Sequence, residues 1–172
     1  TSSFVLHISN KLKLNKHSMI KTIQNFKGLS YRQQIIIKKK NLTIINDSKS
    51  TSFSSSISLL KNNSNILWLV GGINKKGDKF NLSKKYHSNI RAFVYGKKKK
   101  FFNEKLSGKI SYQNFDNLRD ALKNIFKIIK KEKFKNKTIL FSPSAASFDS
   151  FKNFEDRGDY FNKFVKQNLN GL

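Results

Sequence analysis

Short apolar runs and one long amphipathic stripe divide the chain into predicted strands and helices. Residues 66–70 form a continuous apolar run followed by two glycines, a pattern typical of a strand buried on both faces of a sheet, and residues 90–95, followed by Gly96, predict another buried strand. Between residues 114 and 131 the apolar side chains recur at helical spacing, which predicts an amphipathic helix. These side chains are Phe115, Leu118, Leu122, Ile125 and Ile129.

The remaining elements are predicted from shorter patterns of the same kind. Further strands are predicted at residues 33–38, 41–46, 109–112 and 138–141. Further helices are predicted at residues 52–61, 97–106 and 154–169. The first 29 residues hold two helical pieces, at 11–14 and 18–26, and Gly28 is expected to end the second as a helix-capping glycine.

Strands and helices alternate from residue 42 onward, which predicts an α/β fold with a mainly parallel sheet and helices on both faces. The strands at 33–38 and 41–46 are expected to form an antiparallel pair at the start. Ligands of such sheets bind beyond the carboxyl ends of the strands. The loops at 47–51, 71–75 and 142–147 follow strands, so we expect them to converge on a ligand site.

Charge makes nucleic acid the first partner to consider. Lysine and arginine number 35 against 10 acidic residues in a chain of 172, a formal charge of +25. Binding by counterion release needs cations gathered on one face, whereas the lysines are spread along the whole sequence. Abundant Asn, Ile, Phe and Lys are the bias of a low-GC genome, so we interpret the surplus as compositional. A basic nucleic-acid-binding module remains the alternative function.

Several function classes lack the residues that they need. The sequence has no cysteine, which excludes disulfide scaffolds, thiolate metal sites and cysteine nucleophiles. It has neither a GxxxxGK[ST] loop nor a GxGxxG fingerprint, and its three histidines have no metal-ligand spacing. Its longest apolar stretch, around residues 66–72, is too short to span a bilayer. We therefore expect no metal site, no membrane contact and no self-sufficient ATPase or hydrolase.

Four short motifs carry a family resemblance through their order and spacing. They are GLSYR at 28–32, INDSKST at 45–51, a glycine pair followed by lysine at 71–75, and SPSAASFDSFKNFEDRGDYF at 142–161. Together they resemble the C-terminal part of the Mur ligases, and they are most similar to the members that add D-glutamate. The resemblance implies a Rossmann-like C-terminal domain at residues 30–172. Residues 1–29 would be tail helices of a preceding central ATPase domain.

The resemblance also implies an activity. The whole enzyme would use ATP and Mg²⁺ to add D-glutamate to UDP-N-acetylmuramoyl-L-alanine through an acyl phosphate, in the bacterial cytoplasm, for peptidoglycan synthesis. The phosphate loop and the metal ligands would lie in the central domain, outside this chain, so the fragment alone is expected to be inactive. No specific nucleic acid partner is expected.

Three residues receive catalytic or nucleotide-binding roles from the resemblance. Arg32 would reach the ATP phosphates, which suits a guanidinium because it is always charged and forks onto phosphate oxygens. Asp47 would accept hydrogen bonds from ribose or adenine, although an Asx-turn or a helix cap would also explain it. Lys49 would offset the charge of a carboxylate or of the intermediate.

Four further residues would bind D-glutamate by the same resemblance. Thr51 and Ser147 would donate from their hydroxyls, Lys75 would bind the side-chain carboxylate, and Phe154 would contribute its backbone. Local explanations stay open: helix capping for Thr51, a cationic loop for Lys75, local hydrogen bonding for Ser147 and core packing for Phe154.

The chain departs from the family pattern at four positions. Tyr31 stands where His is usual, Ser52 where Asn is frequent, Ile73 where an acid is common and Ala145 where Cys is frequent.

A third possible function is that of a Mur ligase that adds a different amino acid. The segment from 147 to 154 argues against it.

Overall fold

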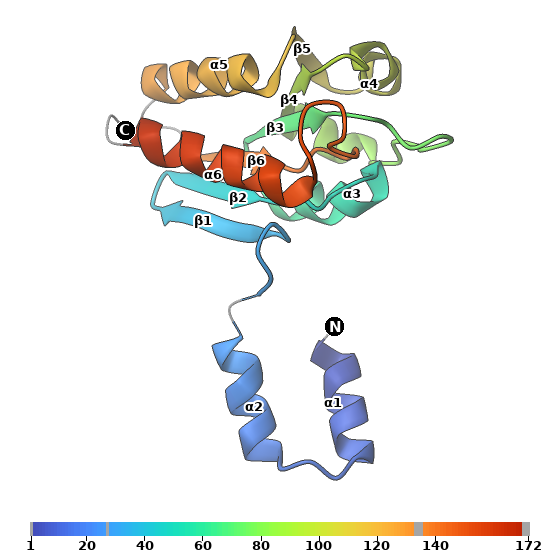
Figure 1. Cartoon of the computed structure of the whole chain (residues 1–172), viewed down its shortest axis with the longest axis vertical. Coiled ribbons are helices and arrows are strands. Elements are labelled where there is room, and N and C mark those ends of the chain that lie inside the picture. The colour runs from blue at the N-terminus through green and yellow to red at the C-terminus, as the bar shows by residue number, and fades with distance from the viewer. Residues whose placement is uncertain (1, 27, 133–135, 170–172) are drawn as a thin grey trace.

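One six-stranded sheet with the order β1-β2-β6-β3-β4-β5 organises the computed structural model, which describes residues 2–26, 28–132 and 136–169 (Figure 1). The strands are β1 (Gln34–Lys39), β2 (Leu42–Asn46), β3 (Ile66–Gly71), β4 (Ile90–Tyr95), β5 (Ser111–Phe115) and β6 (Lys137–Phe141). β1 and β2 pair antiparallel, and the other four pairings are parallel. The predicted α/β, Rossmann-like fold with an antiparallel pair at its start is confirmed.

Helices cover both faces of this sheet, as the alternation predicts (Figure 1). They are α3 (Phe53–Asn62), α4 (Lys99–Leu106), α5 (Leu118–Lys131) and α6 (Phe154–Leu169), with a 3₁₀ helix at Lys84–Asn89 that the pattern did not predict. Neighbouring side chains of β3 lie on opposite faces of the sheet. Trp68 packs with α3 and α4, and Leu69 packs with α5 and α6. The strand is therefore buried on both sides, which is why its sequence is a continuous apolar run.

Two N-terminal helices, α1 (Ser2–Lys11) and α2 (Lys16–Asn25), form a hairpin that stands away from the sheet in Figure 1. Large apolar side chains stay exposed on it: Phe4 is 68% exposed and Leu12 is 64% exposed. The first helix lies earlier than the predicted piece at 11–14. Gly28 has a φ of +78°, as a glycine turn requires, but lies three residues beyond the end of α2. The assignment of residues 1–29 to a preceding domain stays a prediction.

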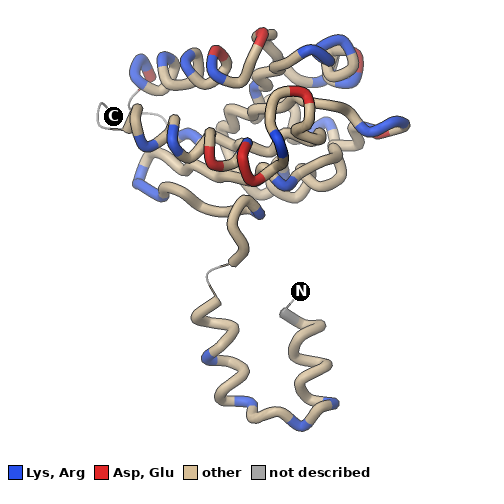
Figure 2. Tube along the Cα trace, in the orientation of Figure 1, with Lys and Arg blue, Asp and Glu red and all other residues tan. Residues whose placement is uncertain are grey.

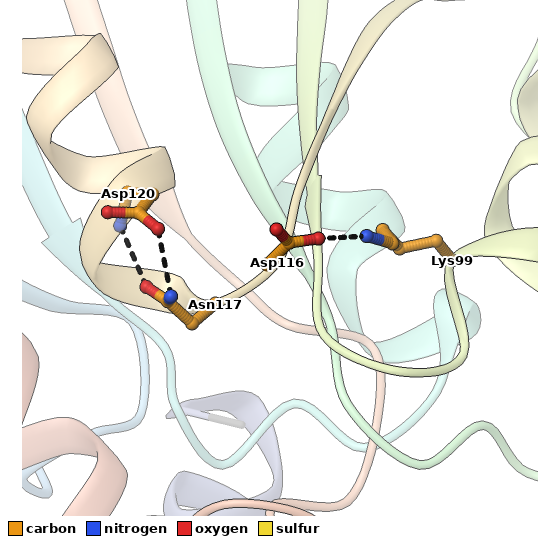
Figure 3. A network of polar contacts seen from close by, with 4 residues as sticks. All are labelled: Lys99, Asp116, Asn117 and Asp120. Atoms are coloured by element: carbon orange, nitrogen blue, oxygen red, sulfur yellow. Dashed lines mark hydrogen bonds and ion pairs between the residues drawn. The ribbon is translucent and has the colours of Figure 1, made fainter.

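The start of α5 corrects the predicted helix at 114–131 (Figure 3). Asn117 is the N-cap: its side chain accepts a hydrogen bond from the Asp120 backbone N–H at 3.0 Å and donates to the Asp120 carboxylate at 2.8 Å. Lys99 pairs with Asp116 just before this cap, at 2.7 Å, and that contact lowers the pKa of Asp116. Phe115 belongs to β5 rather than to the helix, and its ring stacks on Phe93.

The β5 strand runs from Ser111 to Phe115 rather than over the predicted 109–112. The other predicted elements agree with the structure to within two residues at each end. Among the described residues, no helix combines the length and the apolar character needed to cross a bilayer.

Candidate functional site

The three predicted loops converge at the carboxyl edge of the sheet. The Asp47 backbone N–H donates to the Phe141 carbonyl at 2.7 Å, which joins the end of β2 to the end of β6. The Gly71 N–H donates to the Pro143 carbonyl at 3.0 Å, which adds the end of β3. This convergence follows from the parallel register, because the carboxyl ends of neighbouring parallel strands meet at one edge.

A short two-residue bridge holds the second and third loops together beyond the strands. The N–H groups of Ile73 and Ala146 each donate to the other's carbonyl at 2.9 Å. Ser147 follows this bridge directly and is 2% exposed. Lys75 lies two residues beyond Ile73, is exposed, and lines a surface hollow of about 320 Å³ together with Ser52 and others.

The first loop is tied to the third by a backbone bond and by a buried cluster of serine hydroxyls. The Ala145 N–H donates to the Ser50 carbonyl at 3.3 Å. Ser56, on α3, has its Oγ 2.6 Å from Ser142 Oγ and 2.6 Å from Ser144 Oγ. The same oxygen lies 2.7 Å from Ser50 Oγ. α3 therefore fixes both loops through hydroxyls that the sequence pattern did not single out.

Asp47 is buried, and both of its carboxylate oxygens accept hydrogen bonds. One accepts from the Gln33 backbone N–H at 3.1 Å and the other from the Ser142 hydroxyl at 2.7 Å. Burial raises the pKa of Asp47, although these bonds and the positive charge of Arg32 oppose the shift. Each carboxylate oxygen can accept a second hydrogen bond, so the bonds from Gln33 and Ser142 do not use up the acceptor capacity that a nucleotide would need. The contact of Asp47 with ribose or adenine stays a prediction.

The raised pKa of Asp47 leads to a prediction about stability. Because the folded state holds this proton more tightly, the carboxyl favours folding below its unfolded pKa of about 3.9, and this contribution is lost as the pH rises through the folded pKa. Urea unfolding at several pH values between about 3 and 7 measures this effect. The free energy of unfolding of Asp47→Asn should increase relative to that of the wild type as the pH rises.

Asp116→Asn is the control of opposite sign, because the pKa of Asp116 is lowered and its carboxylate favours folding above the unfolded pKa. Its free energy of unfolding should fall behind that of the wild type as the pH rises. A difference between Asp47→Asn and the wild type that stays constant across this range contradicts the account of Asp47.

Lys49 lies between the strand edge and α6. Its backbone N–H donates to the Tyr31 carbonyl at 3.0 Å. Its ammonium lies over the Phe154 ring, with Nζ 3.8 Å from the ring centroid. The Phe154 carbonyl accepts a hydrogen bond from the Ser48 hydroxyl at 2.8 Å. Two predicted site residues, Lys49 and Phe154, are thus in direct contact.

Arg157 is a site residue that sequence reasoning missed. Its side chain is 1% exposed, and Nη2 donates to the carbonyls of Ser48 at 2.7 Å and Ala145 at 3.0 Å. Its Nε donates to the Ser48 hydroxyl at 3.1 Å. One guanidinium on α6 therefore joins the loops after β2 and β6. The available signal was spacing: Arg157 lies on the same helical stripe as the buried Phe161 and Val165.

Arg32 and Thr51 are both exposed at this edge. Arg32 follows the turn at Tyr31 and lies close enough to Asp47 to act on its pKa. Thr51 directly precedes Ser52, the N-cap of α3. Both positions are open to a ligand, and their predicted roles with ATP phosphates and D-glutamate stay predictions.

Lysine and arginine positions are spread along the whole trace rather than confined to one element (Figure 2). Blue segments occur on α5, on α4, in the strand-connecting loops and along the N-terminal hairpin, as the compositional interpretation expects. Red segments lie close together at the start of α6, where Glu155, Asp156 and Asp159 precede or follow the buried Arg157. In the described part of the chain, no three His, Cys, Asp or Glu residues form a group that could hold a metal ion.

The chain is 37% identical over 150 residues to the UDP-N-acetylmuramoylalanine–D-glutamate ligase of Wolbachia sp. subsp. Brugia malayi, a match that covers 87% of this chain and 30% of that protein. The ligase of the same name from Francisella tularensis is 34% identical over 167 residues, which is 95% of this chain and 39% of that protein. No protein-family model matches.

A solved structure agrees on the fold. The crystal structure of a murein peptide ligase from Psychrobacter arcticus matches with a TM-score of 0.50 at 9% identity, over 90% of this chain and 32% of that one. The identity to the two curated ligases, rather than this likeness of fold, shows that the chain is a Mur ligase domain. More narrowly, it is a C-terminal domain like that of the D-glutamate-adding ligases, and it spans 30–39% of the length of the two curated relatives described above.

Proposed function

We propose that this chain is the D-glutamate-binding and nucleotide-capping domain of an ATP-dependent ligase. The full-length enzyme would join D-glutamate to UDP-N-acetylmuramoyl-L-alanine in the cytoplasm, for peptidoglycan synthesis. The observation that carries the proposal is the joining of three motif loops at one sheet edge, through Ser50–Ala145 and Ile73–Ala146. The relatives' names support the choice of amino acid.

The reaction needs positive charge at two places. ATP would phosphorylate the substrate carboxylate and leave as ADP, and Arg32 would meet the ATP phosphates when the domains close. The amine of D-glutamate would then attack the acyl phosphate, so that an amide forms and inorganic phosphate leaves. Lys49 would offset the charge on the reacting oxygens, which is the kind of contact that stabilises such transition states.

D-glutamate brings two carboxylates to the site. Lys75 would pair with the side-chain carboxylate, while the hydroxyls of Thr51 and Ser147 would donate to carboxylate oxygens. Charge-assisted bonds of this kind contribute about 1.5–3 kcal/mol each. Mg²⁺ and the ATP phosphates would be held by the central domain of the full-length enzyme, as the family resemblance implies.

A ligase assay of the full-length protein that contains this chain tests the proposal. UDP-N-acetylmuramoyl-L-alanine and ATP are supplied with D-glutamate or with L-glutamate, and phosphate release and the product mass are followed. D-glutamate should be preferred by at least about 100-fold, because the other enantiomer leaves polar groups of the site unpaired, including the buried Ser147. Equal use of both enantiomers, or no product with D-glutamate, contradicts the proposal.

A salt titration with DNA tests the alternative of a basic nucleic-acid-binding module. The scattered cations in Figure 2 favour only weak, non-specific binding to DNA. Tight binding to DNA that falls steeply with salt and survives Lys75→Ala would support the alternative instead.

A further inference from the structure

The Phe154 ring lies directly under the Lys49 ammonium, at 3.8 Å from Nζ to the ring centroid. Attraction between a cation and an aromatic face acts within about 6 Å, so this pair lies well inside its range. The other lysine–aromatic pairs of the described residues are looser, at 5.1 Å for Lys85 on Tyr86 and 5.6 Å for Lys105 on Phe101. Lys49 is also half-buried, so its side chain lies against the protein rather than extending into solvent.

The Phe154 ring is itself held in place by Tyr31. The two rings meet edge to face, with centroids 6.3 Å apart and an interplanar angle of 74°. The Tyr31 hydroxyl donates to the Asp159 carboxylate at 2.7 Å, one turn further along the helix that Phe154 begins. The Tyr31 ring also lies on Gly158, where an added Cβ would stand 2.3 Å from the ring. Tyr31 is therefore fixed to α6 on two sides.

Tyr31 reaches the other member of the pair as well. Its carbonyl accepts the Lys49 backbone N–H at 3.0 Å. The backbone of Lys49 and the ring beneath its ammonium are thus both set by one residue. The hydroxyl bond to Asp159 gives a physical role to a tyrosine at the position where the family usually has His.

We propose that Phe154 and Tyr31 are positioning residues, which hold the Lys49 ammonium at the rim of the D-glutamate site before substrate binds. An aromatic face suits this task because it attracts the cation without neutralising it, whereas a carboxylate partner would compete with the substrate's carboxylates. Among the described residues, Lys49 forms no ion pair with a carboxylate. The inference rests on the proposed function and deepens it.

Kinetics of the full-length enzyme provide the first test. Phe154→Leu keeps an apolar side chain but removes the aromatic face, and it should lower kcat/KM for D-glutamate about fivefold to 30-fold while leaving KM for ATP unchanged. Phe154→Tyr retains the face and should recover most of this loss. Phe101→Leu makes the same change at the looser pair with Lys105 and should leave kcat/KM within about twofold.

The hydrogen bond from Tyr31 gives a second kinetic test. Tyr31→Phe and Asp159→Ala remove the same bond from opposite ends, so the double variant should lose no more of kcat/KM for D-glutamate than either single variant. Losses that simply add would overturn the role of this bond.

The position of the Lys49 side chain over the Phe154 ring can be tested independently of enzyme activity. The method is nuclear magnetic resonance of the full-length protein carrying ¹³C-labelled lysine. Because the Lys49 Nζ lies over the Phe154 ring, protons of the adjoining ε-methylene should be shifted upfield by the ring current in the wild type and in Phe154→Tyr. The upfield shift should disappear in Phe154→Leu. Absence of this shift in the wild type, or its survival in Phe154→Leu, overturns the inference.

The catalytic role of Lys49 and its positioning by Phe154 are tested separately by two variants. If Lys49→Ala leaves turnover unchanged, the proposed catalytic role of Lys49 is wrong, whatever the resonance of its side chain. If Lys49→Ala removes turnover and Phe154→Leu changes neither kcat/KM nor the ring-current shift, the positioning role is wrong and the proposed function stands.

Discussion

Arg157→Met is expected to lower the free energy of unfolding by roughly 3–5 kcal/mol, because each buried acceptor that loses its donor costs about 1–3 kcal/mol. Methionine fills a similar volume but leaves the carbonyls of Ser48 and Ala145 and the Ser48 hydroxyl without the donors that they now have. A buried acceptor that loses its partner keeps the full cost of its desolvation. Because Arg157 joins two of the three site loops, turnover of the full-length enzyme should fall with stability.

Urea unfolding of the chain measures this effect, with Arg119→Met as the matched control. Arg119 is exposed on α5, so its replacement should change the free energy of unfolding by no more than about 0.5 kcal/mol. Similar values for the two variants would show that the Arg157 hydrogen bonds contribute little to the fold.

The surroundings of Arg157 indicate how closely this part of the molecule is packed. Burial raises the pKa of the Tyr95 hydroxyl to about 12, and the nearby charge of Arg157 opposes that shift. Burial in turn lowers the pKa of Arg157. Among the described residues, the Tyr95 hydroxyl and Arg157 Nη1 lack hydrogen bonds of good geometry. The three bonds that Arg157 does make are therefore the ones that its replacement would remove.

Gly72→Ala is expected to destabilise the chain by about 3 kcal/mol or more, the sum of backbone strain and overpacking. Gly72 has a φ of +125°, a conformation that side chains rarely adopt. A Cβ at this position would stand 2.4 Å from the Ala146 carbonyl oxygen and 3.2 Å from Arg157 Nη1. The 142–147 loop would have to move, and Ser147 with it, so KM for D-glutamate should rise in the full-length enzyme.

Gly108→Ala separates strain from crowding. Gly108 also has a positive φ, +69°, but an added Cβ there would meet no atom within 4 Å. Its replacement should cost only the strain of the left-handed conformation, about 1–2 kcal/mol. Thermal or urea unfolding measures both variants. If Gly72→Ala lowers the free energy of unfolding no more than Gly108→Ala does, the close approach of the 71–75 and 142–147 loops is contradicted.

The sequence predicted the convergence of the three loops better than the contacts that hold these loops together. Alternating strands and helices place the three loops at one edge, because parallel strands end on the same side of the sheet. The Lys49–Phe154 contact could not be predicted in this way, since it joins residues far apart in the chain through tertiary packing. Arg157 was overlooked because an arginine normally lies at the surface, and only its stripe with Phe161 and Val165 indicated burial.

The error at Phe115 has a local cause. Phe115 lies three residues before Leu118, so it fits a helical stripe as well as a strand end. The bonds between Asn117 and Asp120 start the helix after that residue, and Asn is among the preferred capping residues. The capping residue Asn117, rather than the apolar stripe, therefore marks where this helix begins.

The central claim is that the joined loops form a site for D-glutamate, and Ser147→Ala tests it most directly. In the full-length enzyme, KM for D-glutamate should rise at least about tenfold, the effect of losing one hydrogen bond to a charged group, while KM for ATP stays unchanged. Ser150→Ala, an exposed serine of the same segment, is the control and should behave as the wild type. An unchanged KM for D-glutamate in Ser147→Ala would contradict the account.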